Sequence, residues 1–269
     1  MLTRNLDKAR EAYKKGDVSA SIAAHKQKVS AVTPPVGGEH HIHGSGQYIK
    51  SAVYGGLDGT ITTFAVVAGV AGASLSAGIV LILGFANLIA DGISMAVGDY
   101  LSTKSEQEYH KAERRREAWE VDHFPEGEKQ EMEELYTGKG MSKKDAKAMT
   151  AILSKNKKAW VDVMMVEELG IIESEESPFK NALVTFCSFA LFGFIPLIAY
   201  ILSKLMPSLA AQSFIIACVL TGATLFSLGA LKIKFTERNL FLSGFEMLIL
   251  GGITAIAAYG VGWLLSGLM

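Results

Sequence analysis

The sequence predicts an all-α membrane protein with five transmembrane helices and one helical insertion outside the membrane. The chain of 269 residues is 49% hydrophobic with a mean hydropathy of +0.27, which is too apolar for an ordinary soluble domain. The apolar residues also stand in long blocks, because residues 59–90 contain no charged side chain while residues 101–178 are largely polar. Since about 20 apolar residues cross a hydrocarbon core, each block is long enough to hold at least one span.

The first apolar block holds two helices rather than one. Its 32 uncharged residues exceed a single span, and the small, polar segment GASLSAG at 72–78 divides them. The later blocks are cleaner, since Glu246 is the only charged residue within them. The expected spans lie near residues 50–72, 77–100, 181–203, 208–231 and 239–269.

These spans divide the chain into four regions. Residues 1–48 form a polar extension, 49–100 carry the first two spans, 101–178 form the insertion, and 179–269 carry the last three spans. The extension has no short apolar core behind a basic start, so we expect no cleaved signal peptide. The first span then acts as the insertion signal.

Lysine and arginine residues set the expected orientation. On a five-span topology, all but one of the 26 Lys and Arg residues fall on the same side of the membrane, the exception being Lys204. Basic residues next to span ends mark the cytosolic side. We therefore expect the N-terminus and the insertion in the cytosol, and the C-terminus in the opposite compartment.

The composition of the spans favours close helix packing. Small residues recur four apart in the first span, at Ala65, Ala68, Gly69 and Gly72. Pairs of this kind let two helices approach closely. The two cysteines, Cys187 and Cys218, lie in apolar runs and fit small core residues better than a disulfide.

A stripe of potential metal ligands runs along the second span. Its members recur every four residues and are Asn87, Asp91, Met95 and Asp99. Such spacing keeps them near one face of a helix, and Asp58 adds a carboxylate on the neighbouring span, where a charge costs about 2.5–3.5 kcal/mol. Oxygen ligands suit hard divalent ions and a thioether adds a soft donor, so the set favours a first-row transition metal. The alternative is that Asp99 merely ends the span and Met95 is a packing residue.

The insertion carries acidic faces on two expected helices. The first face is spaced i, i+4, i+7 and consists of Glu113, Glu117 and Glu120. A second helix begins at Pro125, which suits a first helical turn, and its acidic face is Glu128, Glu131 and Glu134. Like charges at these spacings repel, so a cation between the faces would stabilise them. The alternative is a solvated acidic face balanced by Arg114, Arg115 and Arg116.

Two more helices complete the expected insertion. Ser142 and Asp145 resemble a capping box that opens the third helix. The fourth reads KKAWVDVMMVEELG and is stopped by Gly170. One of its faces holds Val161, Met164, Met165 and Glu168. Three helices with such faces, one of which bears paired methionines, favour a cation bound between them.

Three stretches of the sequence closely resemble the vacuolar iron transporter family. They are GLDGTITTFAVVAGVAGASLS, ADGISMAVGDYLSTKSE, and the run from FPEGEKQEM to MMVEELG. The likeness covers about residues 48–269, and the order of the spans and the place of the insertion agree with it. The resemblance implies a homodimer of five-helix protomers that moves Fe²⁺, and in some members Mn²⁺, out of the cytosol along the dimer axis in exchange for protons.

The resemblance also assigns residues. Asp58 and Met95 match the family's pathway positions, and the positions of its cytosolic metal-binding helices are matched by Glu117, Glu120, Glu128, Glu131, Met164, Met165 and Glu168. Plant members carry a glutamate where this chain has Asn87, and Asp91, one turn on, is the candidate replacement. The N-terminal 48 residues look more like the extension of bacterial or protist members, so both the vacuolar and the plasma membrane stay open.

Two weaker signals remain. His40, His41 and His43 cluster in a Gly- and Pro-rich stretch, which favours a flexible tail, with weak metal capture as the alternative. EVDH at 120–123 has the Glu-x-x-His spacing of carboxylate di-iron sites, but such sites need two copies and the sequence has one.

Three function classes follow from these patterns. The favoured one is a transporter that exports ferrous iron, with manganese as a second ion, by metal/proton antiport. It is not an enzyme, has no prosthetic group, binds Fe²⁺ with Mn²⁺, Zn²⁺ or Co²⁺ as further candidates, and has no nucleic-acid partner. The rivals are a membrane-anchored ferroxidase or iron-storage protein, and an interaction module. The polar stripe inside the membrane favours transport over both.

Overall fold

The computed structural model describes residues 15–17, 19–20, 23, 43–172, 176–236 and 239–268, without the side chains of 43–47 and 231–236. The chain falls into two units, Met1–Ile49 and Lys50–Met269. The second unit holds the residues discussed below.

The described residues form helices and contain no strand. In chain order the elements are α3 (His43–Gly72), α4 (Ala77–His123), α5 (Pro125–Gly138), α6 (Lys143–Leu153), α7 (Lys157–Glu167), α8 (Pro178–Leu205), the 3₁₀ helix η1 (Pro207–Gln212), α9 (Ser213–Thr236) and α10 (Leu240–Ser266). The predicted all-α class is confirmed.

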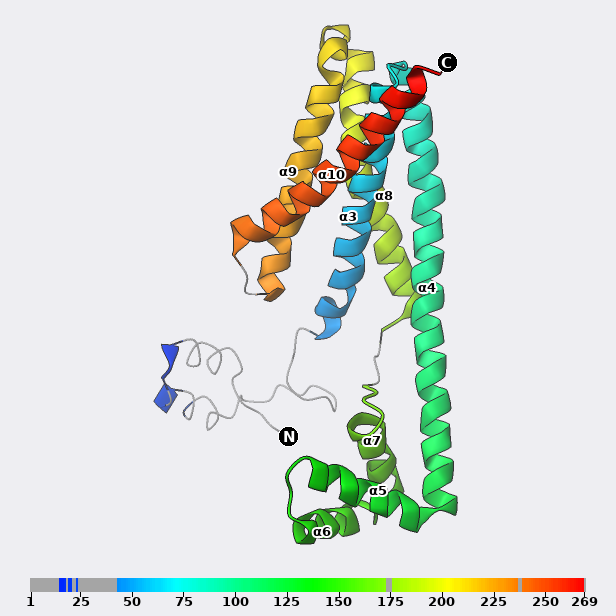
Figure 1. Ribbon diagram of the computed structural model, residues 1–269, viewed down its shortest axis with the longest axis vertical. Coiled ribbons are helices and arrows are strands. Elements are labelled where there is room, and N and C mark those ends of the chain that lie inside the picture. The colour runs from blue at the N-terminus through cyan, green and yellow to red at the C-terminus, as the bar shows by residue number, and fades with distance from the viewer. Residues whose placement is uncertain are drawn as a thin grey trace, which may run out of the picture. The chain divides into compact units, whose positions relative to one another are not determined.

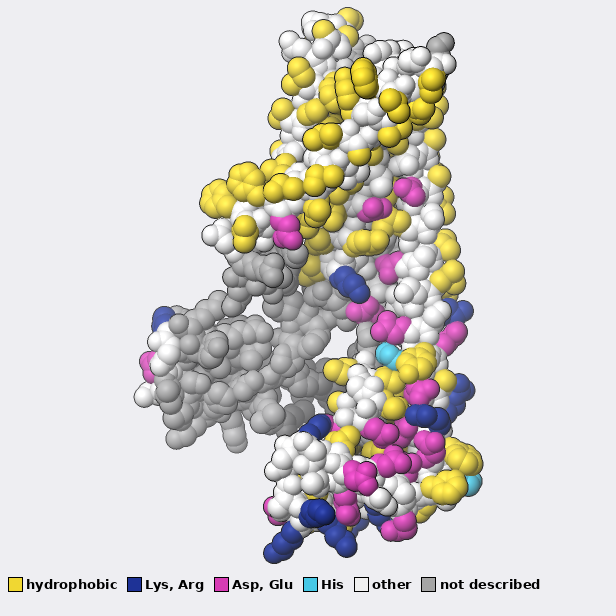
Figure 2. All heavy atoms as spheres, viewed as in Figure 1, with side chains coloured by type: hydrophobic (Ala, Val, Ile, Leu, Met, Phe, Trp, Pro, Cys, Tyr) yellow, Lys and Arg dark blue, Asp and Glu magenta, His cyan; other side chains and the backbone are white. Residues whose placement is uncertain are grey.

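Five of these helices, α3, α4, α8, α9 and α10, are long and apolar enough to cross a membrane. Within this group α4 packs along α8, α8 along α9, and α9 along α10. Figure 2 shows hydrophobic side chains covering these helices, whereas acidic and basic side chains gather around α5 to α7. Exposed apolar side chains such as Ile82 and Ile256 have the outward placement that contact with lipid requires.

The predicted break between the first two spans is confirmed. α3 ends at Gly72, and α4 begins at Ala77 after a turn in which Ser74 has a φ of 56°. Small residues let α3 approach its neighbours. A Cβ on Gly59 would run into the carbonyl oxygen of Phe189 in α8, and one on Gly72 into that of Tyr259 in α10.

The helix that carries the second predicted span does not end at residue 100. α4 continues without a break to His123 and is 47 residues long, about 70 Å. Figure 1 shows it running from the membrane helices to α5–α7. The continuation is expected from composition, because residues 101–123 contain neither Gly nor Pro and are rich in Glu, Lys, Arg and Ala. The predicted boundary between regions therefore lies inside a helix.

The insertion is built by local signals at helix ends. Pro125 lies in the first turn of α5, and Ser142 Oγ accepts a hydrogen bond from the backbone N–H of Asp145 at the start of α6. Asn156 caps α7 in the same way, and Gly170 takes a φ of 66° just after that helix. The helices of the insertion share a hydrophobic core, which consists of Val121, Met132, Tyr136, Ala146, Trp160, Val161, Met164, Met165 and Ile171.

Among the described residues, two ion pairs join α7 to α4. Arg114 and Lys157 join α4 to α7 through Asp162 and Asp122 respectively. Together with the hydrophobic core of the insertion, these pairs hold α7 beside α4, and the cluster described next has carboxylates on α4 and at the end of α7.

Candidate metal centre and membrane pathway

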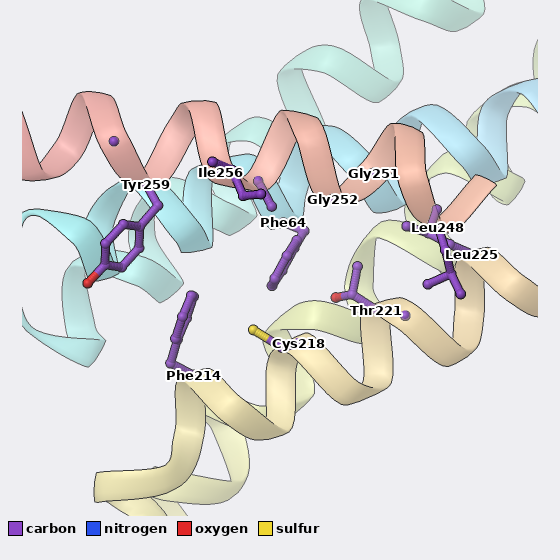
Figure 3. Close-up of a pocket in the computed structure, with 13 residues that line it drawn as sticks. Phe64, Phe214, Cys218, Thr221, Leu225, Leu248, Gly251, Gly252, Ile256 and Tyr259 are labelled. Carbon is purple, nitrogen blue, oxygen red and sulfur yellow. The ribbon is translucent and has the colours of Figure 1, made fainter. Parts of the chain in front are cut away.

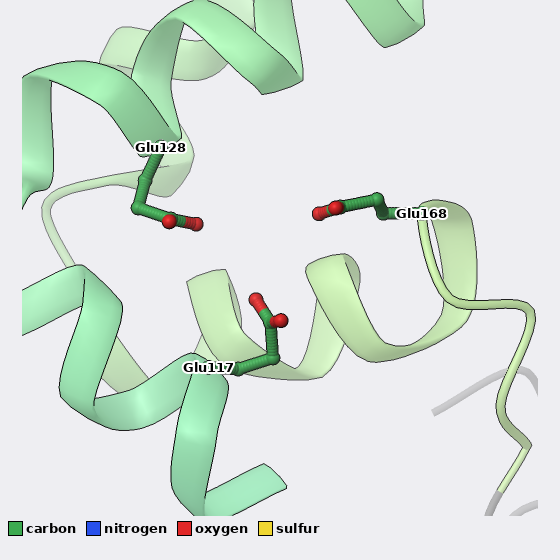
Figure 4. Close-up of side chains that lie close together, drawn as sticks. All are labelled: Glu117, Glu128 and Glu168. Atoms are coloured by element: carbon green, nitrogen blue, oxygen red, sulfur yellow. The ribbon is translucent and has the colours of Figure 1, made fainter. Parts of the chain in front are cut away.

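Three glutamates from three elements converge in the insertion. Glu117 comes from α4, Glu128 from α5, and Glu168 is the residue that caps the end of α7. One carboxylate oxygen from each lies within 4.8 Å of the others. Figure 4 shows the three carboxylates pointing toward one another. All three were predicted as metal ligands, and the turn at Phe124 between α4 and α5 brings the first two together.

Two of these carboxylates are buried without full hydrogen bonding. Glu117 is 2% exposed and Glu128 is 5% exposed, while Glu168 lies at the surface. Among the described residues, Glu117 Oε2 and Glu128 Oε2 have no hydrogen-bond partner. Buried carboxylate oxygens are costly unless they are paired or bind a cation. The arrangement therefore has the chemistry of an open cation site.

The electrostatics of the cluster point the same way. Burial, followed by repulsion from neighbouring carboxylates, raises the pKa of Glu117 to about 7 and that of Glu128 to about 7. Burial and the charge of Glu131 also raise the pKa of Glu168. Near neutral pH the cluster thus holds protons that a metal ion can replace.

The other predicted ligands of the insertion take different places. Glu113 and Glu120 pair with Arg116, and Glu131 is exposed on α5. Met164 and Met165 belong to the buried hydrophobic core, one turn before Glu168. The shared buried face with Val161 is confirmed, and a ligand role for either sulfur stays a prediction.

In the membrane helices, the residues of the predicted stripe on α4 have different surroundings. The carboxylates of Asp58 on α3 and Asp91 on α4 lie close enough for their charges to interact. Met95 packs against the hydrophobic core of the membrane helices, and Asn87 Nδ2 is buried without a partner among the described residues. The carboxylate of Asp99 instead accepts a hydrogen bond from Thr185 of α8.

The separation of Asp99 follows from helix geometry. A step of four residues advances about 40° beyond a full turn, so three steps rotate Asp99 by about 120° from Asn87. Sequence spacing alone gave no sign of Thr185, which lies 86 residues further along the chain. This contact is compatible with both predictions for Asp99, a ligand of the pathway and a residue that merely ends the span at the interface.

A separate cavity of about 610 Å³ lies between α3, α9 and α10. Figure 3 shows the side chains that line it, including Phe64, Phe214, Leu248 and Tyr259. The lining contains no carboxylate, so it offers a divalent ion no anionic oxygen ligand. The membrane carboxylates, rather than this cavity, mark the candidate ion path.

Comparison with known proteins decides the family. The model of the VIT family matches residues 49–263, which is most of the chain. The chain belongs to the VIT family. A vacuolar iron transporter of Toxoplasma gondii is 44% identical over 268 residues, covering 97% of this chain and 89% of that protein.

Two further VIT-family relatives give the same picture. A vacuolar iron transporter of Plasmodium falciparum is 34% identical and covers 97% of both chains. Vacuolar iron transporter 1 of Arabidopsis thaliana is 34% identical over 80% of this chain and 85% of its own. These relatives are named as transporters, which supports metal transport by a multi-pass membrane protein rather than enzymatic catalysis.

The di-iron motif of the rival hypothesis gains no support within this VIT-family chain. The ring of His123 stacks on Trp119 at 4.2 Å, and its Nδ1 lies 2.8 Å from the Trp119 carbonyl oxygen. No histidine of the described residues joins the three carboxylates. His40 and His41 lie outside the described residues, as does the side chain of His43.

Proposed function

We propose that this chain exports Fe²⁺ from the cytosol across a vacuolar or plasma membrane, with Mn²⁺ as a second substrate, in exchange for protons. The observation that carries the proposal is the cluster of three carboxylates on α4, on α5 and at the end of α7, two of which are buried and incompletely paired. α4 also carries Asp91 in the membrane, and relatives over most of the chain are named vacuolar iron transporters.

The insertion is the part that gathers ions from the cytosol. Glu117, Glu128 and Glu168 offer oxygen ligands, which suit Fe²⁺ and Mn²⁺, and a divalent charge offsets their mutual repulsion. Ligation needs the deprotonated carboxylates, so loading the site releases protons. Cytosolic placement of the insertion is part of the proposal, supported by the basic residues that flank the spans.

Asp58 and Asp91 form the membrane step of the proposed cycle. Two neighbouring carboxylates in a membrane repel each other until a proton or a metal ion neutralises them. Metal binding displaces protons, and reprotonation from the far side after the metal leaves completes the exchange. Asp91 thus supplies the carboxylate that plant relatives place at the position of Asn87.

A homodimer is the proposed working unit. Asp58, Asp91 and Met95 are only partly buried in the single chain. A path for a charged ion must be enclosed by protein or water rather than lipid. A second copy packed over this face would enclose it.

Flux into proteoliposomes tests the proposal. Wild-type protein should carry Fe²⁺ and Mn²⁺ and should carry Ca²⁺ much more slowly, because Ca²⁺ prefers more oxygen ligands and gains nothing from a thioether. Asp58→Ala should abolish flux, whereas the exposed substitution Glu126→Gln serves as the matched control. Wild-type flux in Asp58→Ala would contradict the assigned path.

A further inference from the structure

Arg116 places a permanent positive charge among the carboxylates of the candidate metal centre. Its Nη2 lies 3.0 Å from Glu113 Oε2 and 3.1 Å from Glu117 Oε1. Its Nε lies 3.8 Å from Glu120 Oε2. Residues three and four apart are neighbours on a helix surface, so helix geometry explains the contacts with Glu113 and Glu120.

Helix geometry does not explain the contact with Glu117. Adjacent residues on a helix point in different directions and do not face each other. The guanidinium of Arg116, which is 50% exposed, must turn toward a carboxylate that is 2% exposed. Three carboxylates whose oxygens lie within 4.8 Å of one another supply the negative field that draws it there.

The same contact sets Arg116 against an arriving metal ion. Glu117 gives Oε1 to the arginine, while its Oε2 has no partner among the described residues. A divalent ion held by Glu117, Glu128 and Glu168 would repel the nearby guanidinium, and partly buried charges are weakly screened. Because arginine keeps its proton at physiological pH, this charge can move away but cannot be neutralised.

We propose that Arg116 is a built-in competitor of the transported ion, which holds Glu117 in the metal-free protein and turns out to solvent when a divalent ion loads. This inference rests on the proposed function, because it concerns the same ion-gathering site. Competition weakens the binding of every divalent ion, so the site fills only as the free ion concentration rises and empties readily afterwards. The half-exposed side chain has solvent within reach, so the movement does not require α4 to unfold.

Mn²⁺ binding to the full-length protein in nanodiscs tests the proposal, with free Mn²⁺ read by electron paramagnetic resonance. Arg116→Gln should tighten the Kd about tenfold, which corresponds to about 1.4 kcal/mol. Arg115→Gln is the matched control, because it removes the same charge from the preceding residue, which is exposed. Among the described residues, Arg115 takes part in none of the ion pairs. Its Kd should stay within about twofold of the wild-type value.

Thermal unfolding without metal separates competition from a structural role. Arg116→Gln leaves Glu113, Glu117 and Glu120 without their counter-ion, so the Tm of the metal-free protein should fall while Mn²⁺ binding tightens. If Arg116 merely supported the fold, its replacement would lower both the Tm and the affinity for Mn²⁺. If Arg116→Gln fails to fold, Arg116→Lys replaces it. Its Kd should lie below the wild-type Kd by less than about tenfold, because lysine keeps the charge but lacks the planar fork that reaches several carboxylates.

A Kd in Arg116→Gln or Arg116→Lys that equals or exceeds the wild-type value overturns the proposal. Glu117→Gln distinguishes this failure from failure of the proposed function. If the ion-gathering site is assigned correctly, Glu117→Gln loses Mn²⁺ binding whatever Arg116 does. Wild-type protein that binds no Mn²⁺ overturns both.

Discussion

Two buried glutamates make the metal centre sensitive to protons. Burial and neighbouring carboxylates raise the pKa of Glu117 and of Glu128 from 4.5 to about 7. Between pH 4.5 and about pH 7 the folded chain therefore binds more protons than the unfolded chain. The free energy of unfolding of the metal-free protein therefore decreases as the pH rises through this window. A metal ion replaces the protons on the same oxygens.

The first prediction concerns this pH dependence. The contribution of Glu117 is fully present below about pH 4.5 and is lost as the pH rises through about 7. Glu117→Gln cannot ionise, so at pH 8 without metal it should be more stable than wild type by roughly 1–2 kcal/mol. Thermal unfolding at pH 5 and pH 8, with Glu126→Gln as an exposed control, measures this. Wild-type stability that increases with pH would contradict the assignment, whereas added Mn²⁺ should restore stability at pH 8.

The second prediction separates Asp99 from the pathway. Its carboxylate accepts a hydrogen bond from Thr185, which is 1% exposed. Asp99→Asn keeps an acceptor oxygen and should retain flux within about twofold, whereas Asp99→Leu leaves the threonine hydroxyl unpaired and should cost about 1–3 kcal/mol. Flux and Tm measured on both variants decide the matter. Loss of flux in a fully stable Asp99→Asn protein would return Asp99 to the ion path.

At the scale of the helices, the residues that begin or end a helix could be recognised in the sequence. The lack of such a residue after position 100 was not recognised as a sign that the helix continues. Pro125, Ser142 and Gly170 act on their own turns, so three helix boundaries of the insertion could be placed from sequence. The end of the second span was inferred from the change in polarity near residue 100. Polarity ends a membrane segment but does not end a helix, and nothing in residues 101–123 stops one.

The third prediction tests whether the continuity of α4 matters. Ser105 is exposed between the membrane part of α4 and the carboxylates. Ser105→Pro removes one backbone hydrogen bond and kinks the helix at a cost of about 3 kcal/mol, whereas Ser105→Ala preserves it. We expect flux in the proline variant to fall at least about tenfold while Mn²⁺ binding stays within about threefold of wild type. Equal flux in both variants would show that a straight α4 is not needed for transport.

At the scale of the whole molecule, the metal centre depends on contacts that no local pattern encodes. The acidic faces were predictable from spacing, but the choice of Glu117, Glu128 and Glu168 requires the packing of α4, α5 and α7. Arg116 was expected only as a general counter-charge, and its turn toward Glu117 arises from the assembled field. The five spans were predictable because hydropathy over about 20 residues is a strong signal.

The most direct test of the central claim is proton movement during Fe²⁺ transport. Liposomes that contain the protein and a pH-sensitive dye are clamped at zero membrane potential, and Fe²⁺ is added outside with and without an acidic interior. Antiport predicts Fe²⁺ uptake that accelerates with the gradient and makes the interior less acidic, and it predicts loss of both signals in Asp58→Asn, which keeps the shape of the side chain but cannot titrate. Fe²⁺ flux that ignores the gradient and moves no protons would contradict the account.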